Sequence, residues 1–308
     1  MTLIDEYEFV ASEISELEHI LATISEDRVL ERYSFETRLH RAKALLSTLS
    51  SQGSTVCLIF KGKAVDGTRS ISADFGAKAL EAFSDVFATV AVGAVMDLSS
   101  RGPLPEKEKN LLRIVGTAIG SFGFELELPQ DPTGPFTSPE DTMQKIESLL
   151  KASSSGSDDD VTDVAFDLPS RATNVVNKFL NILVSNESWC GLTYKNKKFY
   201  YDNLEQVKKS AERLADNNVQ HDCKILKGKF KGILPIGRTF EFLPEPSEND
   251  YDVIRGKIDS AIIDTTKLNR EWLEKLVQVK LHFIQIGRGK PRYALKSLND
   301  LILQGETP

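Results

Sequence analysis

The chain has 308 residues, of which 41% are hydrophobic and 27% are charged, as in an ordinary globular protein. This length is about twice that of a typical domain, so we expect two domains. The formal net charge of −7 is unevenly placed, because residues 1–160 carry 26 acidic and 15 basic side chains. Residues 161–308 carry 19 acidic and 23 basic side chains, so the charge changes sign between the two halves.

Several classes of protein are excluded by the same sequence. The three cysteines, Cys57, Cys190 and Cys223, form no CxxC pair, which argues against a secreted disulfide framework. The N-terminal segment carries acids where a signal peptide has a basic region. The longest apolar stretch, 86–96, is short of the roughly 20 residues that a membrane span needs. We therefore expect a cytoplasmic protein with no membrane partner.

Two helical patterns open the chain. In the first, apolar residues recur three and four positions apart, and this heptad seam consists of Tyr7, Val10, Ile14, Leu17, Leu21 and Ile24. A second helical period covers residues 34–49. Two interpretations fit residues 1–50: a helical hairpin that packs on its own domain, or a coiled-coil seam for homo-oligomerisation or for docking a protein partner.

Strand and helix patterns alternate in the next hundred residues. The predicted elements are a buried strand at 55–60, a helix from Ser72 or Asp74 through Val90, strands at 111–117 and 121–128, and a helix at 138–151. We therefore predict an acidic, helix-rich α/β domain over residues 1–151.

A run of serines, one glycine and three aspartates, SSSGSDDD, occupies residues 153–160. This run contains no apolar residue with which to build a core. We predict a flexible linker at 152–161, and a domain boundary at the same place.

Residues 162–308 are predicted to form a basic, β-rich domain. Short strands separated by glycines are typical of a small antiparallel β-barrel or sandwich. The predicted elements are helices at 169–184, 204–214 and 270–273, a hairpin at 192–201, and strands at 223–226, 228–234, 239–243, 253–258, 261–263, 277–286 and 292–295. The whole chain is then an α+β protein, with an N-terminal helical hairpin, a small α/β module, a linker and a β-rich module.

No motif identifies a catalytic centre, and we expect neither a cofactor nor a metal ion. Residues 62–67 carry the glycines of a phosphate loop but lack its Lys-Ser/Thr. Strand period places Glu125 and Glu127 on one face, with Asp131 nearby, and carboxylates are ligands of divalent cations. Alternation of acids with phenylalanines is equally typical of a half-exposed strand.

Cations interleaved with aromatic residues in the C-terminal half are the stronger indication of function. Cations neutralise phosphates and aromatic rings stack on bases, which is how small barrels hold single-stranded nucleic acid. The candidate nucleic-acid contacts are Lys195, Lys197, Lys198, Tyr200, Lys227, Lys229, Lys231, Arg238, Arg288, Lys290 and Arg292. In the other interpretation, lysines at turns and edge strands keep the protein soluble and prevent edge-to-edge pairing.

These features favour a non-catalytic binding or assembly protein. The acidic half would associate with itself or with a protein partner, and the basic half would contact nucleic acid or an acidic partner. One alternative is a metal-dependent hydrolase with its site around Glu125, Glu127 and Asp131. Another is a regulatory accessory of a bacterial defence system, antiviral or of the toxin–antitoxin kind, which rests only on the general character of the chain.

Overall fold

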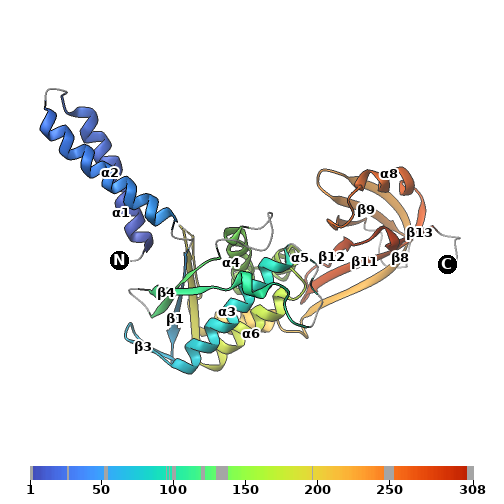
Figure 1. The fold of residues 1–308 in the computed structure, drawn as a ribbon. Coiled ribbons are helices and arrows are strands. Elements are labelled where there is room, and N and C mark those ends of the chain that lie inside the picture. The colour runs from blue at the N-terminus through green and yellow to red at the C-terminus, as the bar shows by residue number, and fades with distance from the viewer. Residues whose placement is uncertain are drawn as a thin grey trace. The chain divides into compact units, whose positions relative to one another are not determined.

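A computed structural model describes residues 3–25, 28–51, 55–94, 96, 98, 102–118, 122–129, 138–195, 197–245 and 253–303 (Figure 1). The helices are α1 (Leu3–Thr23), α2 (Val29–Ser51), α3 (Ala73–Gly93), α4 (Pro139–Ser155), α5 (Asp158–Phe166), α6 (Ala172–Ser185), α7 (Leu204–Arg213) and α8 (Thr265–Trp272), with 3-10 turns η1 (Lys107–Asn110) and η2 (Leu298–Asp300). The strands are β1 (Thr55–Gly62), β2 (Val65–Asp66), β3 (Ser70–Ile71), β4 (Arg113–Thr117), β5 (Gly123–Glu127), β6 (Ser188–Tyr194), β7 (Lys197–Tyr200), β8 (Val219–Leu234), β9 (Thr239–Pro244), β10 (Ile254–Ile258), β11 (Leu276–Ile286), β12 (Arg292–Leu295) and β13 (Leu301–Leu303).

The predicted α+β class is confirmed, because helices and strands are both abundant and the C-terminal part contains a closed five-stranded barrel. The chain divides into two compact units. Unit 1 comprises Met1–Val95, Leu104–Glu147 and Ile182–Leu204, and unit 2 comprises Met96–Pro103, Ser148–Asn181 and Glu205–Pro308. The division therefore differs from a single boundary at 152–161, because residues 182–204 belong to the N-terminal unit.

Helices α1 and α2 of unit 1 form a hairpin with its own small core. Val10, Leu17 and Ala42 are buried in this core. Ile14 packs against it, as do Phe35, Leu39 and Leu46 of α2. The middle of the heptad seam thus covers α2, while Leu21 and Ile24 are half-buried and the side chain of Tyr7 lies outside the described residues. Homo-oligomerisation through this seam stays a prediction.

A five-stranded antiparallel sheet, in the order β4-β5-β1-β6-β7, forms the centre of unit 1. One face carries Leu58 and Phe60 of β1, which are fully buried. Helix α3 packs against this face, where the rings of Phe60 and Phe75 meet edge to face with centroids 5.3 Å apart. The strand alternation predicted for β5 is confirmed, since Glu125 pairs with Cys57 and Leu126 with Val56.

Five strands of unit 2 close into a barrel. The order is β12-β10-β9-β8-β11, and β11 pairs again with β12, which closes the ring. All neighbours are antiparallel except β10 and β12, which run parallel. Helix α8 lies between β10 and β11 in the chain and buries Leu268 against the barrel core. A barrel, one of the two predicted alternatives, is therefore the architecture of this unit.

Two strand predictions in the barrel region differ from the structure in more than their ends. Residues 223–234 form the end of one long strand, β8, although Gly228 was expected to separate two strands. A Cβ on Gly228 would lie 2.2 Å from the carbonyl oxygen of Leu243, so the glycine allows β9 to approach closely instead of ending the strand. Residues 261–263, expected as a strand, lie in the turn before α8.

The prediction of a flexible linker at 152–161 is wrong, because these residues belong to two helices. Residues 152–155 are the last turn of α4, and Ser157 caps the N-terminus of α5. The Ser157 side chain accepts a hydrogen bond from the backbone N–H of Asp160, and the Asp160 carboxylate accepts one from the backbone N–H of Ser157. This reciprocal capping box starts a helix, and its negative first turn complements the helix dipole.

Candidate nucleic-acid interface

A groove of about 890 Å³ crosses the outer surface of the barrel in unit 2. It extends over the end of β8 and over β9, β10 and the start of β12, and α5 and α8 flank it. Gly256 lines it, and a Cβ there would come within 2.5 Å of the Phe240 ring, so this ring occupies the space that a side chain would fill. The polar and charged groups are Lys231, Thr239, Glu241, Arg255, Lys257, Asn269, Arg292, Asp163 and Asp167.

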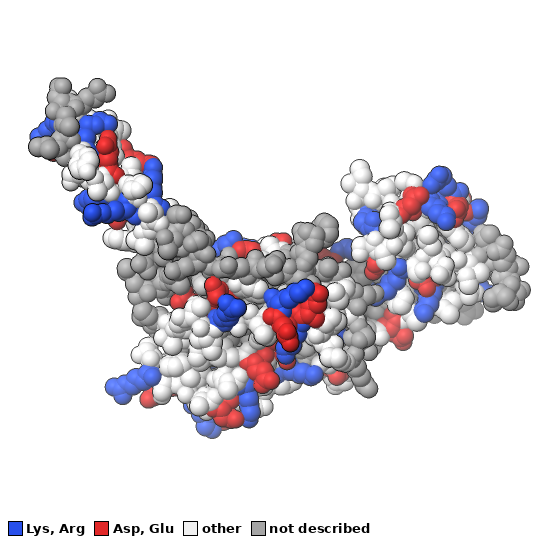
Figure 2. Space-filling view, viewed as in Figure 1, with Lys and Arg blue, Asp and Glu red and all other residues white. Residues whose placement is uncertain are grey.

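Every cation that lines this groove has a carboxylate partner. The pairs are Lys231 with Glu274 (2.7 Å), Arg255 with Glu241 (2.8 Å), Lys257 with Asp167, and Arg292 with Asp163. Hydrogen bonds from Lys231 and Lys229 lower the pKa of Glu274, and the hydrogen bond to Asp163 raises the pKa of Arg292. On the face seen in Figure 2, Lys and Arg accordingly lie beside Asp and Glu in unit 2, with no continuous positive patch.

Arg238, one of the predicted nucleic-acid contacts, joins two connections of the barrel. Its Nε donates to the carbonyl of Ile258 at 3.3 Å, and its Nη2 donates to the carbonyls of Asp259 and Ile262. Ile258 is the last residue of β10, and Asp259 and Ile262 lie between β10 and α8, whereas Arg238 ends the turn between β8 and β9. Its guanidinium is therefore engaged in holding the barrel together.

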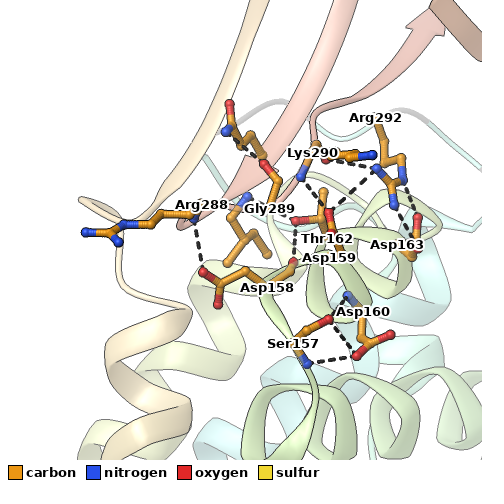
Figure 3. A network of polar contacts seen from close by, with 12 residues as sticks. Ser157, Asp158, Asp159, Asp160, Thr162, Asp163, Arg288, Gly289, Lys290 and Arg292 are labelled. Carbon is orange, nitrogen blue, oxygen red and sulfur yellow. Dashed lines mark hydrogen bonds and ion pairs between the residues drawn. The ribbon is translucent and has the colours of Figure 1, made fainter.

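The acidic start of α5 holds the turn between β11 and β12, as Figure 3 shows. The carboxylate of Asp158 accepts a hydrogen bond from the backbone N–H of Arg288 at 3.0 Å, and that of Asp159 accepts one from the backbone N–H of Lys290 at 2.6 Å. A Cβ on Gly289 would lie 2.7 Å from the carbonyl oxygen of Asp158, so only glycine allows this approach. The predicted contacts Arg288 and Lys290 therefore have their backbones fixed by aspartates of the segment 152–161.

The remaining predicted cations of unit 2 lie on β8. Lys229 and Lys231 both pair with Glu274, the former at 3.3 Å. Lys227 is exposed, and Gln278 of β11 lies opposite to it in the sheet. Of these three lysines, Lys231 alone lines the groove.

The predicted contacts at the β6–β7 hairpin belong to unit 1, whereas the barrel belongs to unit 2. Lys198 and Tyr200 are two residues apart on β7, so their side chains project to the same face of the sheet. The ammonium group of Lys195 lies 3.6 Å from the carboxylate of Glu140. Lys197 is exposed at the first position of β7. Sequence patterns missed Trp189 and Lys61, which the β1–β6 register places opposite each other near this hairpin.

The carboxylates considered as a metal site do not gather further ligands in the part of the chain that the structure describes. Within that part, no group of three or more His, Cys, Asp or Glu side chains could hold a metal ion. Glu125 is buried, with the Thr55 hydroxyl 3.5 Å from its carboxylate, and Glu127 borders a different cavity. Asp131 lies outside the described residues.

The strand order of the barrel defines a class of fold. Numbered within the barrel, strands β8, β9, β10, β11 and β12 follow the order 1-2-3-5-4-1, with a helix between the third and fourth, which is the arrangement of an oligonucleotide/oligosaccharide-binding (OB) barrel. The groove crosses the second and third strands, the face on which such barrels bind ligands. Comparisons with protein families, curated proteins and solved structures find no match to the chain. No helix among the described residues is long and apolar enough to cross a membrane.

Proposed function

We propose that the chain is a non-catalytic binding protein whose barrel contacts single-stranded nucleic acid. One observation carries this proposal: an open groove with four cations crosses the second and third strands of a barrel with OB strand order. The resemblance to OB barrels is one of strand order, and one fold can carry several functions. The residues of the groove therefore decide which ligand it can bind.

The groove offers the groups that a single strand requires. Arg255 and Lys257 lie on either side of Gly256 on β10, and Arg292 starts the neighbouring strand β12. Their spacing along and across the strands suits a backbone that crosses the sheet, with one phosphate for each cation. Tyr293 also lines the groove, half-buried against the barrel core with its ring centroid 6.0 Å from that of Phe283, and its exposed part is the proposed contact for a base.

The carboxylate partners of these cations determine how binding takes place. A phosphate that reaches Lys257 or Arg292 replaces Asp167 or Asp163, both of which lie on or directly after α5. Because the ion pairs are at least partly exposed to water, each exchange costs at most about 1 kcal/mol. The aspartates thus lower the affinity for any polyanion and favour ligands that also supply base contacts.

The second part of the proposal concerns the α1–α2 hairpin, which we propose associates with a protein partner or with another copy. Its exposed aromatic residues, Phe9 (62% exposed) and Tyr33 (70% exposed), support this role. Light scattering of the full chain tests self-association, and a strict monomer would leave only a heterologous partner.

The barrel proposal is tested by fluorescence anisotropy with a labelled oligothymidylate of about 12 nucleotides at low salt. We expect binding by the full chain and a loss of roughly tenfold in affinity for the double variant Arg255→Gln, Lys257→Gln. The matched control is Lys275→Gln, a change of the same kind at an exposed lysine outside the groove. Absence of binding at low salt, or an equal loss in the control, would overturn the proposal.

A further inference from the structure

The outer face of the unit 1 sheet, opposite α3, carries a second set of aromatic and cationic residues. In the register of β1, β6 and β7, Trp189 lies opposite Lys61, and Thr193 lies opposite Lys198. Residues that face each other in an antiparallel pair project to the same side of the sheet. These four side chains therefore project away from the buried face that contains Phe60.

The ring of Tyr200 lies flat on this face, above Gly191. A Cβ on Gly191 would lie 2.1 Å from Cδ1 and 2.5 Å from Cε1 of Tyr200, so the ring occupies the space that a side chain would fill. The Tyr200 hydroxyl lies 2.8 Å from Oγ1 of Thr193, two residues further along β6. The ring is thus held at two points, and 43% of Tyr200 remains exposed. A fixed aromatic ring with an open outer surface is suited to stacking.

A slot of about 190 Å³ lies beside this ring, lined by Ile59, Lys61, Trp189, Cys190, Gly191, Tyr200, Tyr201 and Asp202. It is smaller than the roughly 300–1,000 Å³ of an enclosed small-molecule site. A slot of this size takes only part of a ligand, beside Trp189 and Tyr200, and leaves the rest of that ligand outside.

The charges of this face differ from those of the barrel groove. Lys61 and Lys198 are exposed, and no ion pair with either is found among the described residues. An anionic ligand therefore displaces no carboxylate from these two lysines. Aromatic surface flanked by unpaired cations complements a nucleobase that is attached to phosphates.

We propose that this face binds an unpaired base of single-stranded nucleic acid, stacked on Tyr200 beside Trp189, with its phosphates on Lys61 and Lys198. The site is separate from the barrel groove and shares only the ligand class of the proposed function. A protein that docks on Tyr200 would use the aromatic ring but would not need a base, so the choice of probe distinguishes the two occupants.

Trp189 provides a local probe, because the chain has only one other tryptophan, Trp272 in α8. In a full-length Trp272→Phe background, titration with unlabelled oligothymidylate or oligoadenylate at low salt should quench the emission of Trp189. Tyr200→Leu, which still covers Gly191, should weaken this binding by about 5- to 100-fold, and Tyr200→Phe, which retains the ring, should not. Unfolding midpoints of the two variants separate a loss of stacking from a loss of folding.

The contribution of the two lysines is tested with the double variant Lys61→Gln, Lys198→Gln. The control is Lys78→Gln, because Lys78 lies on α3, where it pairs with Asp74. We expect the double variant to weaken quenching several-fold and the control to leave it unchanged. Unquenched Trp189 at saturating oligonucleotide, or equal quenching in Tyr200→Leu, would overturn the inference. The barrel variants Arg255→Gln, Lys257→Gln should leave the quenching intact, so failure of either site is recognised independently of the other.

Discussion

The barrel groove and the outer sheet face of unit 1 both combine cations with aromatic rings, yet they differ in what the cations contact. In the groove, Lys231, Arg255, Lys257 and Arg292 all have carboxylate partners. On the sheet face, Lys61 and Lys198 have none among the described residues. A count of basic residues therefore does not measure the capacity of a surface to bind phosphate, since a paired cation must first exchange its partner.

The two regions also differ in how the chain builds them. The groove depends on α5, whose carboxylates fasten the β11–β12 turn through Asp158 and Asp159. The sheet face depends on the register of three strands and on Gly191, which makes room for a flat Tyr200 ring. The groove is thus held by contacts between a helix and a turn, whereas the aromatic surface of the sheet is held by strand pairing.

The largest effect that we expect concerns Arg238, a cation near the groove that has a structural role. Arg238→Gln removes charge-assisted hydrogen bonds to the carbonyls of Ile258, Asp259 and Ile262. Hydrogen bonds to charged groups contribute about 1.5–3 kcal/mol, so we expect the free energy of unfolding of the barrel to fall by about 2–3 kcal/mol. Urea denaturation followed by circular dichroism measures this change.

Arg255→Gln is the matched control, since 78% of the Arg255 side chain is exposed. This variant should leave the free energy of unfolding within about 0.5 kcal/mol and should weaken oligonucleotide binding instead. If Arg238→Gln lowers affinity without lowering stability, Arg238 is a ligand contact and its assignment to the fold is incorrect.

A smaller effect is expected when the acidic partners of the groove are neutralised. Asp163→Asn with Asp167→Asn removes the nearest carboxylates of Arg292 and Lys257, and Asp159 stays 4.0 Å from Arg292. We expect oligonucleotide affinity to rise by about tenfold, or about 1.4 kcal/mol, because phosphate no longer competes with these two carboxylates. Anisotropy titrations of this variant measure the gain, and Asp74→Asn on α3 is the control. An unchanged or reduced affinity would show that these aspartates do not compete with the ligand.

The sequence predicted local features of both regions but not their assembly. The spacing of hydrophobic residues and the turn residues predicted β1, β5, β9, β11 and β12, and the face of β5 on which Glu125 lies. The pairing of β1 with β6 joins residues far apart in the chain, so no local pattern could place Lys61 beside Trp189. Neighbouring lysines in the sequence indicate Tyr200 as a candidate contact, whereas the position of its ring depends on Gly191 of the adjacent strand.

The misassigned linker shows how composition can conceal a helix. SSSGSDDD has the composition of a flexible segment, yet Ser157 and Asp160 have the S-x-x-D spacing of a capping box. That spacing, followed by Val161 and Ala165, was the available signal for α5. The partners of Asp158 and Asp159 could not have been found in this way, because they are backbone N–H groups of a distant turn.

The smallest effect, and the one that compares the two regions most directly, is the salt dependence of binding. Binding to the sheet face is measured alone in the double barrel variant Arg255→Gln, Lys257→Gln. Two phosphate contacts on this face predict that log affinity falls with log salt concentration with a slope of about −1.4. Binding to the groove is measured in the variant Tyr200→Leu. Four phosphate contacts there would give a slope of about −2.8 if the four cations had no carboxylate partners. Each displaced carboxylate takes up a cation from solution, which offsets one released from the nucleic acid, so we expect a slope shallower than about −2.8. Adding Asp163→Asn and Asp167→Asn should steepen it, and a groove slope already at about −2.8 would show that its ion pairs do not compete with phosphate.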